Sequence, residues 1–326
     1  MDDKREPSCP RYELESYVTS IHDDNAKFTL EVLRSGEEVI GDIYDTDVFE
    51  WVLQPFERLF AELAPSPALP DNHAGIKVTL QEYLFPKFFI FVLDVVKEKL
   101  QPRQIEMEKS PYSPSNVWLD DEFLDDLKKW TSLYNPAGIV LSFENPEDAL
   151  YKPPRKVLID GGQTACFFKQ CYSTVQTTNE LQAYKKIAAA NIDPQFHICR
   201  LFGAVMDDDG FIVGLLLTYI DHGGRTLSTN VDPDYPPAST RNRWIGQLDA
   251  ALAELHKAGI VWGDVKAENV LVDREDNVWI IDFGGGYTQG WVDKQLAGTV
   301  DGDLAGMAKL REFIFQDGAQ DRWWAR

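Results

Sequence analysis

The chain has 326 residues, of which 44% are hydrophobic and 12% aromatic. These proportions are typical of a globular protein and exclude a disordered tail, and the length allows two domains or one large lobed domain. Lysine and arginine number 32 against 53 aspartates and glutamates, a formal charge of −21, which disfavours nucleic acid and anionic membranes as partners. Ordinary solubility is the simpler explanation of that charge.

The cysteines and the apolar runs indicate where the protein resides. The four cysteines form no C-x-x-C pair, so we predict no zinc site. The first ten residues are charged and lack an apolar core, and the longest apolar run, residues 84–96, is too short to cross a bilayer. We therefore expect an intracellular, cytoplasmic protein, with entry into the nucleus left open, as is the oligomeric state.

Residues 1–112 carry no catalytic motif, and we expect them to form an α/β extension whose role the sequence leaves open. Their patterns predict a β-hairpin over 28–40, a helix over 47–63 and a buried strand over 88–96. Three prolines in residues 101–116 predict a linker.

The next segments predict a mixed sheet and its helices. An amphipathic helix is predicted over 120–134 and strands over 138–143, 155–160 and 164–171, with Lys169 near the end of the third strand. A helix should follow with Thr178 or Asn179 as its N-cap and Glu180 in its first turn.

A second hairpin is predicted over residues 197–220, and glycines at 223 and 224 are typical of a hinge after it. Ser239 is expected to cap the following helix, whose apolar residues extend from Trp244 to Leu255.

The most informative stretch is residues 256–286. Asp264, Lys266 and Asn269 form the pattern D-x-K-x-x-N, and Asp282 opens D-F-G. Short apolar runs at 259–262, 270–272 and 278–281 predict strands that would hold these polar groups rigidly at loop ends, where a ligand can reach them.

These two motifs, at this spacing, resemble the catalytic loop and the D-F-G segment of the protein-kinase-like superfamily, in particular the short kinase-like proteins of filamentous fungi. The resemblance implies an α+β, two-lobed fold over residues 117–326. The small lobe would take residues 138–217, the hinge 218–224 and a reduced large lobe 225–326.

The resemblance also implies ATP and Mg²⁺ as cofactors and a hydroxyl-bearing substrate. Asp264 would orient the acceptor hydroxyl, and Lys266 would neutralise the transferred phosphoryl group. Asn269 and Asp282 offer the oxygen ligands that Mg²⁺ prefers.

Further roles follow from the same resemblance. Lys169 would hold the α- and β-phosphates, and Glu180 would orient that lysine. The hinge residues Leu217, Thr218 and Tyr219 would contact the nucleotide. Asp303 would brace the catalytic loop from a buried helix.

The chain departs from the family pattern in three places. Trp262 and Gly263 replace His-Arg before Asp264, so we expect activity without phosphorylation of an activation loop. Residues 144–157 contain no glycine where a glycine-rich loop should cover the phosphates. The A-P-E segment is missing, which favours a small molecule or a restricted protein as the acceptor.

Several alternatives stay open. Asp264, Asn269 and Asp282 are each common as turn, capping or strand-ending residues, and only their joint spacing favours a functional site. Glu180 lies only eleven residues after Lys169, and acidic residues are frequent in first helical turns. The chain could also be an inactive pseudokinase that serves as an interaction module, or an enzyme that uses ATP for nucleotidyl transfer or acyl activation.

Overall fold

The chain forms two compact units that are interleaved along the sequence. Unit 1 comprises residues 1–114 and 139–154, and unit 2 comprises residues 115–138 and 155–326. The computed structural model describes residues 18–20, 26–28, 54–56, 58–59, 78–85, 87–97, 99–106, 114–115, 117–143, 153–231, 236–285 and 288–315.

Unit 1 contains a four-stranded sheet in the order β1 (Val18–Ser20), β2 (Ala26–Phe28), β3 (Lys87–Val96) and β4 (Lys99–Ile105). Strands β2 and β3 are parallel, and the other neighbours are antiparallel. The strand predicted over 88–96 is therefore confirmed as β3.

The linker predicted over 101–116 is wrong for residues 101–105, because these belong to β4. Pro102 lies opposite Leu93 of β3. Strand β4 is the edge of its sheet, where a residue without a backbone N–H is tolerated. Proline content alone therefore does not distinguish an edge strand from a linker.

The other described elements of unit 1 are η1 (Gln54–Phe56), α3 (Leu80–Leu84) and β6 (Val140–Leu141). A capping box between Thr79 and Glu82 begins α3. Leu141 donates a backbone hydrogen bond of 2.8 Å to Val78. Nearly all of the predicted hairpin over 28–40 and most of the predicted helix over 47–63 lie outside the described residues.

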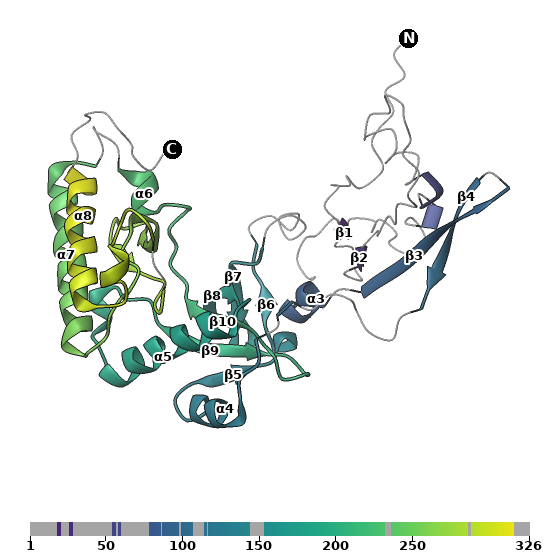
Figure 1. Ribbon diagram of the computed structural model, residues 1–326, viewed down its shortest axis with the longest axis horizontal. Helices are drawn as coiled ribbons and strands as arrows, with labels where there is room; N and C mark the ends of the chain where they lie inside the picture. The colour runs from purple at the N-terminus through teal and green to yellow at the C-terminus, as the bar shows by residue number, and fades with distance from the viewer. Residues whose placement is uncertain are drawn as a thin grey trace, which may run out of the picture. The chain divides into compact units, whose positions relative to one another are not determined.

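The sheet of unit 2 positions most of the candidate site. Its strands follow the order β5 (Ser132–Tyr134), β9 (Leu201–Met206), β10 (Ile212–Thr218), β8 (Thr164–Gln170) and β7 (Lys156–Ile159) (Figure 1). Strand β5 is parallel to β9, and the other neighbours are antiparallel. The strands predicted over 155–160 and 164–171 and the hairpin over 197–220 are confirmed.

Helix α4 (Asp121–Leu127) is shorter than the predicted helix over 120–134. Asp120 caps it by accepting a 2.8 Å hydrogen bond from the backbone N–H of Phe123. The chain then turns, and Ser132–Tyr134 pairs with β9, where Gly203 leaves room for the Tyr134 ring. Strand pairing and close packing override the helical spacing of the apolar residues.

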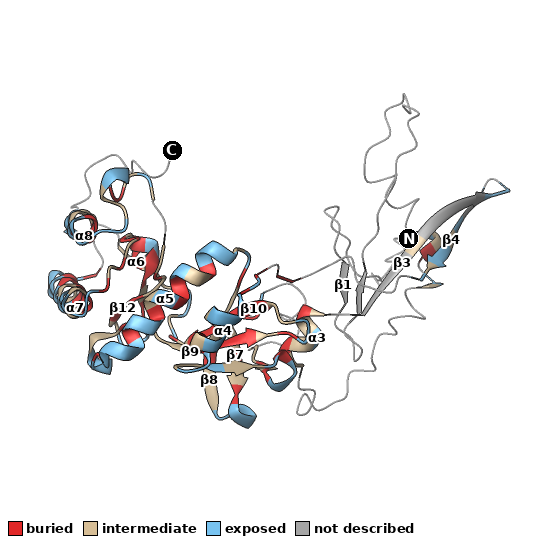
Figure 2. Cartoon of the chain, turned by 60° about the horizontal axis from the view of Figure 1, so that its bottom comes forward, coloured by how far each residue is buried: buried red, intermediate tan, exposed pale blue. Residues whose placement is uncertain are grey.

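Helix α5 (Thr174–Ala190) begins earlier than predicted, because Ser173 is the N-cap. Thr178 lies inside the helix, where its hydroxyl donates to the carbonyl of Thr174. The prediction that Glu180 lies in the first turn is therefore wrong. Glu180 lies one turn further on and is buried, as are Leu181 and Tyr184. Figure 2 shows both buried and exposed residues along α5.

The C-terminal part of unit 2 contains α6 (Leu227–Asn230), α7 (Ala238–Lys257), the hairpin of β11 (Val270–Val272) and β12 (Val278–Ile280), and α8 (Val300–Phe315). Helices α7 and α8 lie side by side (Figure 1). The short 3₁₀ helices of unit 2 are η2 (Pro136–Gly138), η4 (Asp160–Gly162), η5 (Pro194–Phe196), η6 (Ala267–Asn269) and η7 (Lys294–Leu296).

Two local predictions in this part are wrong. Helix α7 has Pro237 as its N-cap, so Ser239 lies within the first turn. Residues 259–262 form no strand, because the N–H of Trp262 donates to the side chain of Asp303 and not to a neighbouring strand.

One hydrophobic core of unit 2 joins its sheet, α5, α7, α8 and the β11–β12 hairpin. Its largest side chains include Trp244, Trp262, Tyr184 and Phe283. Helix and sheet thus share one core, which confirms the α+β class. Within the described ranges, no helix has both the length and the apolar character needed to cross a membrane.

Candidate active site

The first cluster of the site joins a strand, a helix and a loop. The Lys169 ammonium on β8 donates to both carboxylate oxygens of Glu180 on α5, each at 2.9 Å. It also lies 2.5 Å from Oδ1 of Asp282. The structure therefore brings together three predicted site residues, one of which, Asp282, lies 113 positions after Lys169.

Burial and neighbouring charges have opposite effects on the pKa values of Glu180 and Lys169. Burial raises the pKa of the Glu180 carboxyl, and the Lys169 ammonium opposes part of this rise. Burial would lower the pKa of Lys169, but Glu180 and Asp282 outweigh burial and hold that pKa above its ordinary value. Lys169 is thus a fixed positive charge at neutral pH.

The second cluster surrounds the carboxylate of Asp264. Its Oδ2 accepts hydrogen bonds from Lys266 Nζ at 2.5 Å and from Asn269 Nδ2 at 3.1 Å. Its Oδ1 accepts from the Thr288 hydroxyl at 2.7 Å, and Lys266 also donates to that hydroxyl at 3.0 Å. Asp264 is only 6% exposed. These contacts fix the orientation of the carboxylate.

Asp303 on α8 holds the backbone that leads into this cluster. Its two carboxylate oxygens accept 2.8 Å hydrogen bonds from the N–H groups of Trp262 and Gly263. The His256 ring at the end of α7 also bonds to Asp303, at 2.8 Å. Asp303 is 1% exposed, so it ties α7, α8 and the Asp264 segment together from inside the core.

The segment from Asp282 to Gly285 links the two clusters. Asp282 has a left-handed backbone with φ 65°. A Cβ on Gly284 would lie 2.7 Å from the backbone N of Glu180, and one on Gly285 would lie 2.6 Å from Cβ of Asp264. The absence of side chains at these glycines therefore lets one short segment contact both α5 and the Asp264 loop.

The predicted hinge residues lie at the end of β10 and just beyond it. Leu217 pairs with Phe167 of β8, and Thr218 pairs with Cys166. The Thr218 hydroxyl accepts a 3.0 Å hydrogen bond from the N–H of Arg200. The Tyr219 ring lies under the Lys156 ammonium, 4.7 Å from the ring centroid to Nζ.

The donor chemistry fits a magnesium ion that is held partly by ligand phosphates. Asp282 supplies a carboxylate. Both side-chain hydrogen bonds that Asn269 makes in the described part of the chain use its Nδ2, so its side-chain amide oxygen remains as a ligand for a metal. Mg²⁺ typically takes one or two protein carboxylates or amides and completes its shell with phosphates and water. The described residues contain no cluster of three or more histidine, cysteine or acidic side chains that would hold an ion alone.

Sequence reasoning missed two residues of the site. Thr288 was not singled out, because a threonine in a polar segment has no distinctive spacing. His256 begins the informative stretch, but its contact with Asp303 spans 47 positions and no local pattern predicts it. The only signal in the sequence is that both residues are polar and lie close to the motifs.

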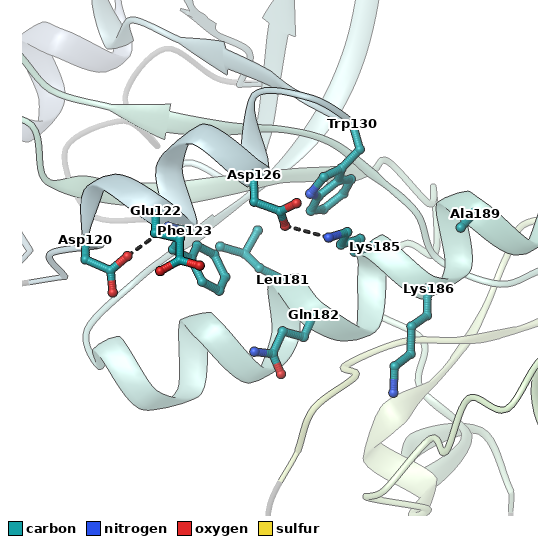
Figure 3. A pocket seen from close by; sticks show the side chains of 10 residues that line it. All are labelled: Asp120, Glu122, Phe123, Asp126, Trp130, Leu181, Gln182, Lys185, Lys186 and Ala189. Atoms are coloured by element: carbon teal, nitrogen blue, oxygen red, sulfur yellow. Dashed lines mark hydrogen bonds and ion pairs between the residues drawn. The ribbon is translucent and has the colours of Figure 1, made fainter.

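A separate cavity of about 640 Å³ lies between α4 and α5 (Figure 3). Its aromatic residues are Phe123 and Trp130, and the Lys185–Asp126 ion pair of 2.6 Å crosses it. It shares no lining residue with the two clusters, so it is not the candidate active site.

Comparison with known proteins supports the resemblance that the motifs predict. Residues 168–299 match the family model of the protein kinase domain, a range that holds every predicted site residue except Asp303. The segment 144–152, which covers most of the glycine-free loop, lies outside the described residues.

Similar proteins include several serine/threonine kinases. Serine/threonine-protein kinase grp of Drosophila melanogaster is 38% identical over 89 residues, which are 27% of this chain and 17% of that protein. Serine/threonine-protein kinase kin-29 of Caenorhabditis elegans is 36% identical over 112 residues, 34% of this chain and 13% of that protein. Aurora kinase of Yarrowia lipolytica is 31% identical over 113 residues, 31% of this chain and 30% of that protein.

The aligned regions thus cover at most 30% of the length of these relatives. The range 168–299 matched by the family model covers the segments that contain the two clusters, and the α+β fold of unit 2 agrees with that match. The chain therefore contains a region, residues 168–299, that is similar to the protein kinase domain.

Proposed function

We propose that this chain is an ATP- and Mg²⁺-dependent phosphotransferase that acts on a hydroxyl group. The observation that carries the proposal is the pair of clusters joined by Asp282–Gly285. One cluster holds a fixed ammonium beside a carboxylate, and the other holds an oriented carboxylate beside a second ammonium. Phosphoryl transfer depends mainly on such positioning and charge neutralisation.

The Asp264 cluster is the acceptor end of the proposed site. Lys266 and Asn269 donate to one carboxylate oxygen and Thr288 to the other, which leaves lone pairs for one further donor. The acceptor hydroxyl would donate to Asp264 and be held in line for transfer. Lys266 would stabilise the negative charge of the transferred group.

The Lys169 cluster is the nucleotide end of the proposed site. Lys169 would bind phosphate oxygens while Glu180 keeps its ammonium in place, since the two form a partly buried ion pair. Asp282 and Asn269 would hold Mg²⁺, which neutralises phosphate charge when it is bound.

The acceptor is proposed to be a small molecule or a restricted set of proteins. The similarity to serine/threonine-protein kinases supports a serine or threonine hydroxyl of a protein. Broad specificity for peptides is disfavoured, because only 21 positions separate Asp282 from Asp303 and the A-P-E segment is missing.

A thermal-shift titration followed by product analysis tests the proposal. Mg·ATP should raise the unfolding temperature of the chain, because a ligand that binds only the folded state stabilises it. Incubation with candidate acceptors should release ADP. Release of AMP or pyrophosphate would instead indicate nucleotidyl transfer or acyl activation, and no stabilisation at millimolar nucleotide would contradict the proposal.

A second candidate is a non-catalytic module of the same fold. The position of the Lys156 ammonium over the Tyr219 ring favours it, because Tyr219 is one of the predicted nucleotide contacts. The assay above separates the two candidates, since a module without enzymatic activity would release no ADP.

A further inference from the structure

The register of three strands places five side chains on one face of the sheet of unit 2. Leu215 of β10 lies opposite Lys169 of β8, and Leu217 lies opposite Phe167. Lys156 of β7 also lies opposite Phe167. Directly opposed residues of antiparallel strands project to the same face, as do residues two apart on one strand. Lys156, Phe167 and Leu217 therefore share the face on which Lys169 meets Glu180.

Phe167 lies two residues before Lys169, a step of about 7 Å along the strand. A ligand whose phosphates bind Lys169 and which extends toward Leu217–Tyr219 has to pass this position. The Phe167 side chain is partly buried and packs against the core of unit 2. A large aromatic ring thus occupies the part of this face next to the phosphate-binding lysine.

Lys156 covers the same region from the other side. Strand β8 lies between β7 and β10 (Figure 1), so the two outer strands are about 10 Å apart. The Lys156 ammonium nevertheless lies 4.7 Å from the centroid of the Tyr219 ring, just beyond β10. The Lys156 and Tyr219 side chains together therefore bridge the width of β8. The contact between an ammonium and an aromatic face is attractive and would resist displacement.

We propose that Lys156, Phe167 and Tyr219 close the base end of the nucleotide site, so that this protein recognises a magnesium-bound oligophosphate and discriminates little between bases. The inference rests on the proposed function, because it assumes that phosphates bind at Lys169. It assigns Lys156 and Phe167 as residues that determine ligand specificity.

Calorimetric titration of the full-length chain with two probes tests the inference. The probes are Mg·ATP and magnesium tripolyphosphate, which has the phosphates without base and ribose. The unmodified chain should bind the two with dissociation constants within about threefold of each other. Phe167→Ala should tighten Mg·ATP binding by about tenfold or more and leave tripolyphosphate within about twofold, because the change makes room only for the base.

Further variants make the result specific. Lys156→Met should also tighten Mg·ATP binding, since it removes the cation above Tyr219 and keeps the length of the side chain. Phe202→Ala is a matched control, because Phe202 belongs to the same sheet and is 43% exposed. It should change neither affinity. Lys169→Met should abolish binding of both probes, which locates them at this site.

Three outcomes would overturn the inference. If the unmodified chain binds Mg·ATP far more tightly than tripolyphosphate, the base is recognised and only the inference fails. If Phe167→Ala weakens Mg·ATP binding while tripolyphosphate affinity is kept, Phe167 stacks on the base and again only the inference fails. If neither probe binds the unmodified chain or its variants, the phosphate site fails, and the proposed function fails with it.

Discussion

Lys169 balances the charge of two carboxylates in unit 2. Glu180 is buried, with its side chain 8% exposed, and Asp282 contacts the same ammonium. Because a buried carboxylate without a partner is costly, the stability of this part of the fold depends on the ammonium. The same three side chains that would bind the nucleotide thus also stabilise the folded domain.

Lys169→Met should make the stability of the chain more sensitive to pH. The raised pKa of Glu180 means that the folded state binds more protons than the unfolded state above about pH 4, so stability falls as pH rises through that window. Removal of Lys169 raises the pKa further and widens the window. The variant should lose about 1–3 kcal/mol at neutral pH and less near pH 4, measured by urea unfolding across pH.

Lys128→Met is the matched control for this experiment. Lys128 forms an exposed ion pair of 3.5 Å with Asp125, whose loss should cost little at any pH. Parallel pH profiles of Lys169→Met and the unmodified chain would contradict the role assigned to the Lys169 cluster.

Asp264→Asn should lower ADP release by about 10²–10⁴-fold, because the amide cannot accept a proton from the acceptor hydroxyl. Binding of Mg·ATP should stay nearly unchanged in calorimetric titration, since Asp264 belongs to the other cluster. Thr288→Val should reduce turnover less, because Lys266 and Asn269 still hold the carboxylate. Retained activity in Asp264→Asn would show that another residue orients the acceptor.

At the scale of elements, helix α8 packs directly on the segment that carries Asp264. A Cβ on Gly306 of α8 would lie 2.6 Å from Cβ of Val265, a contact that side chains do not make. The position of the acceptor carboxylate thus depends on close approach of a helix at one glycine as well as on the hydrogen bonds of Asp303.

Gly306→Ala should destabilise the chain by about 1–3 kcal/mol and lower turnover, because the added methyl pushes α8 away from Val265. Gly246→Ala is the matched control in a neighbouring helix, since a Cβ there would meet nothing within 4 Å. It should stabilise α7 by about 0.5–1 kcal/mol through lower backbone entropy in the unfolded chain. Chemical unfolding and ADP release measure both effects, and equal changes in the two variants would contradict the packing argument.

Most helices and strands of unit 2 could be predicted from sequence periodicity. The wrong predictions are those in which a capping side chain or a contact distant in the sequence determines where an element begins or which type it is. Ser173 begins α5 before the apolar spacing indicates it, and Tyr134 belongs to a strand because of its place beside Gly203. The two motifs predicted Asp264, Lys266, Asn269 and Asp282, since motif spacing is local. Thr288 and His256 could not be predicted, because their partners are brought to them only by the folded chain.

At the scale of the whole molecule, the formal charge of −21 bears on which acceptors approach the site. The negative charge of the protein attracts a cationic acceptor over a distance that shortens as salt increases, whereas it does not attract a neutral acceptor. The charge therefore gives a test of substrate class that needs no knowledge of the natural acceptor.

The KM for a basic peptide acceptor should rise as salt increases from about 10 mM to about 150 mM, because the screening length falls from about 30 Å to about 8 Å. A neutral peptide of the same length with the same hydroxyl residue should show little change. Steady-state ADP release measures both values. The same salt dependence for the two peptides would argue against electrostatic selection of the acceptor.

The interleaving of the two units constrains how the protein can be made and divided. The second segment of unit 1, residues 139–154, is synthesised only after the first segment of unit 2, residues 115–138. Leu141 in that second segment forms a hydrogen bond with Val78 in the first segment of unit 1. On the ribosome, neither unit can therefore be completed before the other has begun. A single proteolytic cut at residue 114 would leave the segment 139–154 attached to unit 2, so isolated unit 2 requires a new start at residue 115 and a new junction between residues 138 and 155.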